Sequence, residues 1–236
     1  MNRNSNLYTI TYAAVMVILV AIGLAFASQS LKGNQRKNEN VDKMQQILRA
    51  LKVDDAKATA ITMYNEVITD AFLVDEAGNI VEGSNGTDEK SPAFTTELKD
   101  MSKTGHAPVF VANINGVTKY VLGLYGQGLW GPIWGYLSVD DDKSTVYGVD
   151  FSHASETPGL GAKITETFFR DQFVQKKIFS AGGTYTSVSV VKPGSHVPAG
   201  RDYVDGISGS TLTSNGVNSM LFDSLKKYEH FLTNKN

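Results

Sequence analysis

The chain contains no cysteine, and this absence removes several classes of chemistry. Disulfides, iron–sulfur clusters, thiolate metal sites and cysteine nucleophiles all require a thiol. Only four histidines are present (His106, His153, His196 and His230), and none of them forms an H-x-x-H pair. We therefore expect no metal site, and any redox chemistry must come from an organic cofactor or from a metal held by other ligands.

A strong excess of charge of one sign is also missing. The 22 Lys and Arg residues nearly balance the 24 Asp and Glu residues, which gives a net charge of -2. Without a basic stripe, nucleic acid is not an expected partner. The length of 236 residues and the apolar fraction of 42% suit one substantial core with an appendage.

Charged residues are absent between Asn4 and Leu31, near the N-terminus. Within this run, residues 7–27 include only Thr9 and Thr11 as clearly polar side chains. As a helix these residues would span about 30 Å, the thickness of a bilayer core. The run therefore predicts a single transmembrane helix.

Two further observations bear on this segment. Ala25-Phe26-Ala27 has the A-x-A pattern of a signal-peptide cleavage site, so a cleaved signal peptide is the alternative to an anchor. The run is longer than the apolar region of most signal peptides, which favours an uncleaved anchor. Basic residues are more frequent after the run than before it, and a positive-inside count would place the following domain in the cytoplasm.

The rest of the chain predicts an α+β domain of mixed strands and helices. We expect a membrane anchor over 1–31, a linker and short helix over 32–55, and one domain over 56–236. Residues 32–40 are polar and predict a linker, whereas apolar spacing predicts helices over 41–51, 54–61, 165–177 and 213–232. Strands are expected over 71–74, 79–81, 109–114, 117–122, 146–151 and 186–191, with Asn115-Gly116 as a hairpin turn.

The first candidate site is the segment 205–216, which reads DGISGSTLTSNG and precedes the last predicted helix. Hydroxyl side chains and glycines crowd a helix N-terminus here, where N–H groups and the helix dipole favour a phosphate. An ordinary N-cap is the simpler interpretation. The segment lacks the last glycine of a nucleophile elbow and the lysine of a P-loop.

Two other segments attract attention. Residues 153–163 contain the turn Thr157-Pro158-Gly159, and Gly159 and Gly161 would let the backbone approach a flat ligand closely. A plain strand-to-helix loop is the alternative. Residues 126–137 hold both tryptophans among several glycines, so they could stack on a planar ring or belong to a core strand.

Together these segments resemble the flavin-binding C subunits of sodium-translocating NADH:quinone reductases. The resemblance is carried by the N-terminal apolar helix, Gly128-Leu129-Trp130-Gly131 with Gly135-Tyr136-Leu137, residues 156–161 (ETPGLG) and residues 205–211 (DGISGST). Ser210 stands where the family normally has alanine. The equivalent subunit of the Rnf complex shares the second and third motifs, and the Gly-Leu-Trp-Gly form of the first favours the quinone reductase.

The resemblance implies that Thr211 carries FMN through a phosphoester, installed from FAD by a separate flavin transferase. It also implies a single-pass protein of the bacterial inner membrane whose domain lies on the periplasmic side, against the charge count. The protein would contact other subunits and lipid, bind no NADH itself, and relay electrons during quinone reduction coupled to sodium export.

The motif residues then receive expected roles in cofactor binding. Ser208 and Thr213 would donate hydrogen bonds to the phosphate, and N–H groups near residues 212–214 would stabilise its charge. Gly209, Ser210 and Leu212 are also expected at the cofactor. Residues 156–161 would form a wall of the ring site, and Trp130 would stack on the ring. The wall consists of Glu156, Thr157, Pro158, Gly159, Leu160 and Gly161, with Leu160 on the ring and Thr157 at its edge. Lys163 would favour negative charge on the reduced ring.

Two functions outside electron transfer stay open on the residues alone. One is an anchored, non-redox module whose helix N-terminus holds a free phosphorylated ligand. The other is a serine hydrolase using Ser208 or Ser210, for which the sequence identifies no His or Asp partner.

Overall fold

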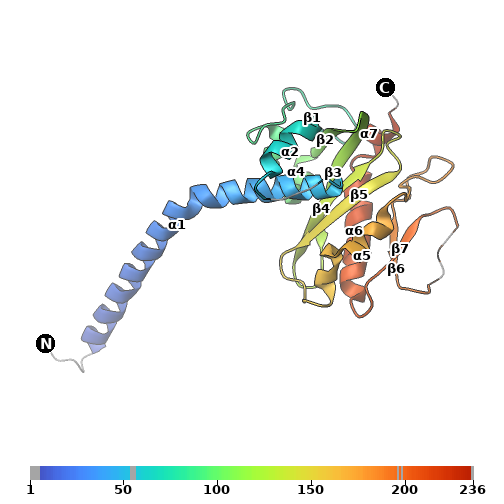
Figure 1. Ribbon diagram of the computed structural model, residues 1–236. Helices are drawn as coiled ribbons and strands as arrows, with labels where there is room; N and C mark the ends of the chain where they lie inside the picture. The colour runs from blue at the N-terminus through green and yellow to red at the C-terminus, as the bar shows by residue number, and fades with distance from the viewer. Residues whose placement is uncertain (1–5, 54–56, 196, 198, 235–236) are drawn as a thin grey trace. The chain divides into compact units, whose positions relative to one another are not determined.

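The structure, a computed structural model, describes residues 6–53, 57–195, 197 and 199–234. The chain divides into two compact units, residues 1–42 and residues 43–236. All three motif segments belong to the second unit, which is a mixed α+β domain as the sequence predicts. Figure 1 shows its sheet with the helices that cover it.

The first helix, α1, runs without interruption from Asn6 to Ala50. Among the described residues it is the one helix long and apolar enough to cross a membrane, and its apolar window has a mean hydropathy of 2.5. The polar segment 32–40 was expected as a linker, but it is helical. It contains no proline, and its Lys, Gln, Arg and Glu residues are good helix formers that remain solvated on every face.

The last turns of α1 contribute to the core of the second unit. Met44, Ile47, Leu48 and Leu51 are at most 2% exposed, which confirms the helical apolar stripe predicted over 41–51. The helix expected over 54–61 lies partly outside the described residues, and the next helix, α2, covers Ala60–Val67 instead.

The core of the domain is a five-stranded antiparallel meander in which each strand pairs with the next in sequence. The strands are β1 (Ile68–Val74), β2 (Ala107–Ile114), β3 (Val117–Gln127), β4 (Pro132–Val139) and β5 (Val146–His153). The turn between β2 and β3 has positive φ at both Asn115 and Gly116, which confirms the predicted hairpin. The strand expected over 79–81 is reduced to one bridge between Ile80 and Val74.

The long C-terminal helix α6 (Thr211–Lys226) packs on the sheet against β3. Val217, Met220, Leu221 and Leu225 are at most 1% exposed on this face. Close approach requires glycine: a Cβ at Gly216 would lie 2.4 Å from the carbonyl oxygen of Gln127. This contact fixes the N-terminal half of α6 beside the end of β3.

The remaining elements are short. The helices are α3 (Pro92–Thr95), α4 (Met101–Thr104), α5 (Thr167–Arg170) and α7 (Glu229–Thr233), with 3-10 turns over Leu98–Asp100, Gly161–Thr165 and Asp171–Phe173. A small parallel sheet pairs β6 (Ser189–Val191) with β7 (Tyr203–Asp205).

Three predicted elements differ in extent from the structure. The helix expected over 165–177 is a chain of short turns, and it ends before Gln175, whose φ of 65° is left-handed. The strand expected over 186–191 keeps only its last three residues. The helix expected over 213–232 breaks after Lys226, where the buried Tyr228 hydroxyl accepts from Gly123 N and donates to Pro108 O.

Candidate functional site

The three motif segments meet at the carboxylate of Glu156, which is 3% exposed. The backbone N–H of Trp130 donates to its Oε1 at 2.9 Å. The hydroxyl of Thr213, in the first turn of α6, donates to its Oε2 at 2.6 Å. The Glu156 side chain, which belongs to the segment 153–163, is therefore joined by hydrogen bonds to the 128–131 turn and to the N-terminus of α6, and a charged acceptor makes these bonds strong.

Two glycines make room for this carboxylate. A Cβ at Gly128 would lie 2.5 Å from Glu156 Oε1. A Cβ at Gly161 would lie 2.4 Å from Glu156 Oε2 and 2.6 Å from Thr213 Oγ1. Real Cβ atoms do not approach so closely, so the glycines of the first two motifs serve to pack the segments around Glu156.

A cavity of about 220 Å³ opens at the N-terminus of α6. Ser208, Gly209 and Thr211 line it, as do the following residues: Lys192, Pro193, Gly206, Ile207, Ser214 and Asn215. Lys192, just after β6, carries the one charged side chain among the described residues of this lining. The first turn of any α-helix presents N–H groups without intrahelical acceptors, so the cavity combines these donors with an ammonium group.

The hydroxyl side chains of the 205–216 segment differ in accessibility. Thr211 and Ser208 are exposed and line the cavity. Ser210 is 6% exposed, and its Oγ has no hydrogen-bond partner in the described part of the chain. Thr213 is 1% exposed, and its hydroxyl donates to Glu156. The expectation from the sequence that this hydroxyl donates to a phosphate is therefore wrong.

Large apolar side chains stand exposed around this N-terminus. Trp130 is 65% exposed, Leu212 61% and Leu160 43%. Leu160 borders the 208–211 loop, because a Cβ at Gly209 would lie 3.3 Å from its Cδ2. The core-strand interpretation is wrong for Trp130, which is exposed outside the strands, whereas Trp134 lies in β4 and is half-buried. We call Trp130, Leu160 and Leu212 the apolar rim.

The other predicted site residues lie in the loop after Glu156. Thr157, Pro158 and Gly159 are exposed, and Gly159 has the left-handed φ of 75° that its turn requires. The carbonyl of Thr157 accepts from the N–H groups of Leu160 and Ala162. Lys163 is half-buried, and it does not belong to the described lining of the cavity.

The chain is similar in sequence to a known domain family and to named proteins. Residues 128–226 match the model of the FMN-binding domain family. The chain is 30% identical to the C subunit of the Na+-translocating NADH-quinone reductase of Vibrio alginolyticus, over 92% of this chain and 89% of that protein. It is 30% identical to the corresponding C subunit from Vibrio vulnificus, strain YJ016, over 85% of this chain and 83% of that protein.

A solved structure agrees with these sequence matches. The C subunit of the Na+-translocating NADH-quinone reductase from Parabacteroides distasonis is 53% identical, with a TM-score of 0.81, over 87% of this chain and 98% of that chain. The chain belongs to the family of these C subunits. The resemblance drawn from the three motifs is confirmed.

The region matched to the FMN-binding family contains every segment of the candidate site, including Lys192. Sequence reasoning missed Lys192 and Pro193, and it gave no role to Asn215 within the segment 205–216. Asn215 carried a signal, since it is one helical turn after Thr211 and thus shares its face. Lys192 carried none, because only the pairing of β6 with β7 brings it beside the motif.

Proposed function

We propose that the chain is an electron-carrying subunit of a Na+-translocating NADH-quinone reductase, with FMN bound covalently through a phosphoester to Thr211 Oγ. The observation that carries this proposal is an exposed Thr211 at the start of α6, which lines a cavity together with Lys192, while Leu212 follows it in the chain and Leu160 borders Gly209. Family membership and the match to the FMN-binding domain support the same cofactor.

The cavity suits one end of FMN. Pockets that enclose a drug-sized ligand usually measure about 300–1,000 Å³. At about 220 Å³ and with Lys192, Ser208 and Thr211 in its lining, this cavity fits the phosphate and adjacent hydroxyls, whereas the ring would lie outside it. A flavin that is held mainly at its phosphate gains little affinity from burial, so it would dissociate readily. A covalent bond at the phosphate would prevent this loss.

Each residue of the site then has a separate task. Lys192 and the N-terminus of α6 stabilise the negative charge of the phosphodiester, and the dipole contributes about 0.3–1 kcal/mol. Ser208 is placed to donate a hydrogen bond to it. The exposed apolar rim and the exposed residues 157–160 would contact the ring and exclude water from one of its faces. FMN supplies one- and two-electron redox chemistry when bound.

Attachment involves only the side chain of Thr211. Its hydroxyl loses a proton and its Oγ forms a bond to the flavin-side phosphorus of FAD, while AMP leaves with the electrons of the broken pyrophosphate bond. No base contacts Thr211 Oγ in the described part of the chain, which supports catalysis by a separate flavin transferase. Burial of Ser210 and Thr213 favours Thr211 as the acceptor among the three neighbouring hydroxyls.

The apolar part of α1 would anchor the chain as a single-pass protein in the bacterial inner membrane, in contact with lipid. We propose a periplasmic domain that exchanges electrons with other subunits during sodium export. Because long domains cross membranes largely regardless of charge, the positive-inside count does not oppose this placement. An uncleaved anchor predicts that the mature chain keeps its first residues, which intact-mass measurement would report.

The test is detection of the bond. The full chain, coproduced with a flavin transferase and denatured, is expected to fluoresce in a gel and to gain the mass of FMN less one water. Thr211→Ala should abolish the label, whereas Ser210→Ala, Thr213→Val and Ser208→Ala should retain it. A phosphorylated ligand released from the wild-type chain by denaturation would contradict the proposal and favour an anchored binding module.

A further inference from the structure

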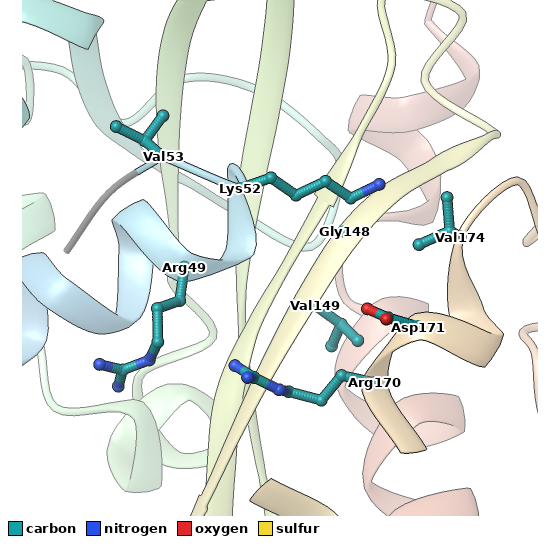
Figure 2. A pocket seen from close by; sticks show the side chains of 8 residues that line it. All are labelled: Arg49, Lys52, Val53, Gly148, Val149, Arg170, Asp171 and Val174. Carbon is teal, nitrogen blue, oxygen red and sulfur yellow. The ribbon is translucent and has the colours of Figure 1, made fainter. Parts of the chain in front are cut away.

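A second cavity, of about 260 Å³, lies between the C-terminal end of α1, strand β5 and the segment around α5. Its lining shares no residue with the cavity at Thr211. Figure 2 shows Arg49 in the last turn of α1, Lys52 just after that helix and Arg170 at the end of α5. The remaining lining residues are Val53, Gly148, Val149, Asp171 and Val174.

Two of the three cations share one carboxylate. Asp150, 2% exposed in its side chain, accepts from Arg49 Nε at 3.0 Å and Nη2 at 3.1 Å, and also from Arg170 Nη1. Burial raises the pKa of Asp150, and the two guanidinium groups oppose that rise. Among the described residues, the cavity lining and Asp150 together hold three positive and two negative side chains, with Asp171 as the second negative one.

Donor groups are also left over. A guanidinium has five N–H donors, yet among the described residues Arg170 bonds only Asp150 and, at 3.4 Å, the Thr167 hydroxyl. Its Nε is buried without an acceptor among the described residues. The ammonium of Lys52 lies 5.0 Å from the centre of the Tyr147 ring, and it contacts no acceptor in the described part of the chain. Such unused donors favour a ligand that accepts hydrogen bonds.

The backbone holds this arrangement in place. A Cβ at Gly148 would lie 2.5 Å from the carbonyl oxygen of Ala50 and 3.3 Å from Lys52 Cε. Glycine at 148 therefore lets the end of α1 rest directly on β5. Lys52 itself has a left-handed φ of 57°, the conformation that ends many helices, and this turn carries its side chain across Gly148 (Figure 2).

We propose that this cavity binds an oxyanion, a carboxylate or a phosphate group, through Lys52 and Arg170. Guanidinium and ammonium groups recognise both anions by charge-assisted hydrogen bonds. The anion is either a free small molecule or a side chain of another subunit, and the experiment separates these two sources. The inference does not depend on covalent FMN, because it concerns different residues.

The first arm is calorimetric titration of inorganic phosphate into the detergent-solubilised full chain carrying its flavin, at constant ionic strength. Saturable binding is expected, and Lys52→Gln should weaken it about tenfold or more, since one hydrogen bond to a charged group is lost. The matched control is Lys99→Gln, at another exposed lysine, which should bind as the wild type does. Affinity lost in Lys192→Gln but kept in Lys52→Gln would move the binding to the cavity at Thr211 and overturn the proposal.

Arginine Nε–H resonances give a second measurement that does not depend on variants of the site. The chain has five arginines, so each signal can be assigned. Phosphate should shift the signal of Arg170, while those of Arg36 and Arg201 stay in place.

The second arm uses the assembled complex, to detect an anion supplied by a neighbour. If a side chain of another subunit occupies the cavity, Lys52→Glu should reduce copurification of the other subunits severalfold, and Lys99→Glu should not. If phosphate binds and the Lys52→Glu chain assembles normally, the ligand of the cavity is a free anion. If phosphate does not bind and assembly of Lys52→Glu is also normal, the site is refuted.

Discussion

Removing the Glu156 carboxylate tests whether one buried side chain holds the site together. Its two oxygens accept from Trp130 N at 2.9 Å and from Thr213 Oγ1 at 2.6 Å. A hydrogen bond to a charged group contributes about 1.5–3 kcal/mol, so loss of both in Glu156→Ala should lower the free energy of unfolding by about 3–6 kcal/mol. Glu156→Gln keeps one acceptor oxygen and should lower it by about 1–2 kcal/mol.

The assay is urea denaturation of the flavin-carrying chain, followed by the fluorescence of Trp130 and Trp134. Thr213→Val removes the donor alone, and combining it with Glu156→Gln should give a coupling energy of about 0.5–3 kcal/mol. Glu166→Ala, at an exposed carboxylate in the same region, should change stability by less than about 0.5 kcal/mol. A loss below about 1 kcal/mol in Glu156→Ala, or a coupling near zero, would show that this carboxylate does not join the segments.

Three further perturbations follow from packing and charge. Gly216→Ala places a Cβ 2.4 Å from Gln127 O and should lower the free energy of unfolding by about 1–3 kcal/mol. Gly182→Ala is the control, because its Cβ would have its nearest neighbour at 3.9 Å, and it should leave stability unchanged. Equal urea midpoints for the two variants would contradict this prediction. Burial lowers the pKa of Lys43 from 10.5 to about 8, so the unfolded chain binds more protons between these values and stability should rise with pH across that window. A Lys43→Met chain measured by urea denaturation from pH 7 to 10 should lack this rise, and an unchanged rise would exclude Lys43 as its cause. Lys192→Gln should slow flavin attachment about tenfold in a timed gel-fluorescence assay, because a charge-assisted hydrogen bond to the phosphate is lost, and Lys192→Arg should restore the rate. An unaltered rate in Lys192→Gln would show that Lys192 does not contact the phosphate.

Local patterns were sufficient for much of the fold. The hairpin around Asn115-Gly116 could be predicted because two adjacent residues determine its turn. The apolar faces of α1 and α6 follow from helical spacing. Helix through residues 32–40 was missed because a polar run without proline suits both a linker and a solvated helix.

The site was predictable in its parts but not in its assembly. Its three segments could be singled out by glycines, hydroxyls and aromatics, but the Glu156 carboxylate joins them only after the sheet has formed. Lys192 reaches the cavity through a parallel pair between strands separated by a long loop, and no local pattern encodes that pairing. Tertiary contacts also decided which hydroxyls stay accessible, leaving Thr211 exposed and Thr213 enclosed.

The meander has a consequence for the timing of synthesis. Each strand pairs with its sequence neighbour, so the sheet can form progressively as the polypeptide leaves the ribosome. Helix α6 is the last of the joined segments to emerge, and without it the Glu156 carboxylate lacks the Thr213 donor. Thr211 therefore acquires its folded surroundings only after translation has passed the whole sheet. If FMN is attached there as proposed, a transferase that recognises those surroundings would act on a finished domain rather than on a nascent one.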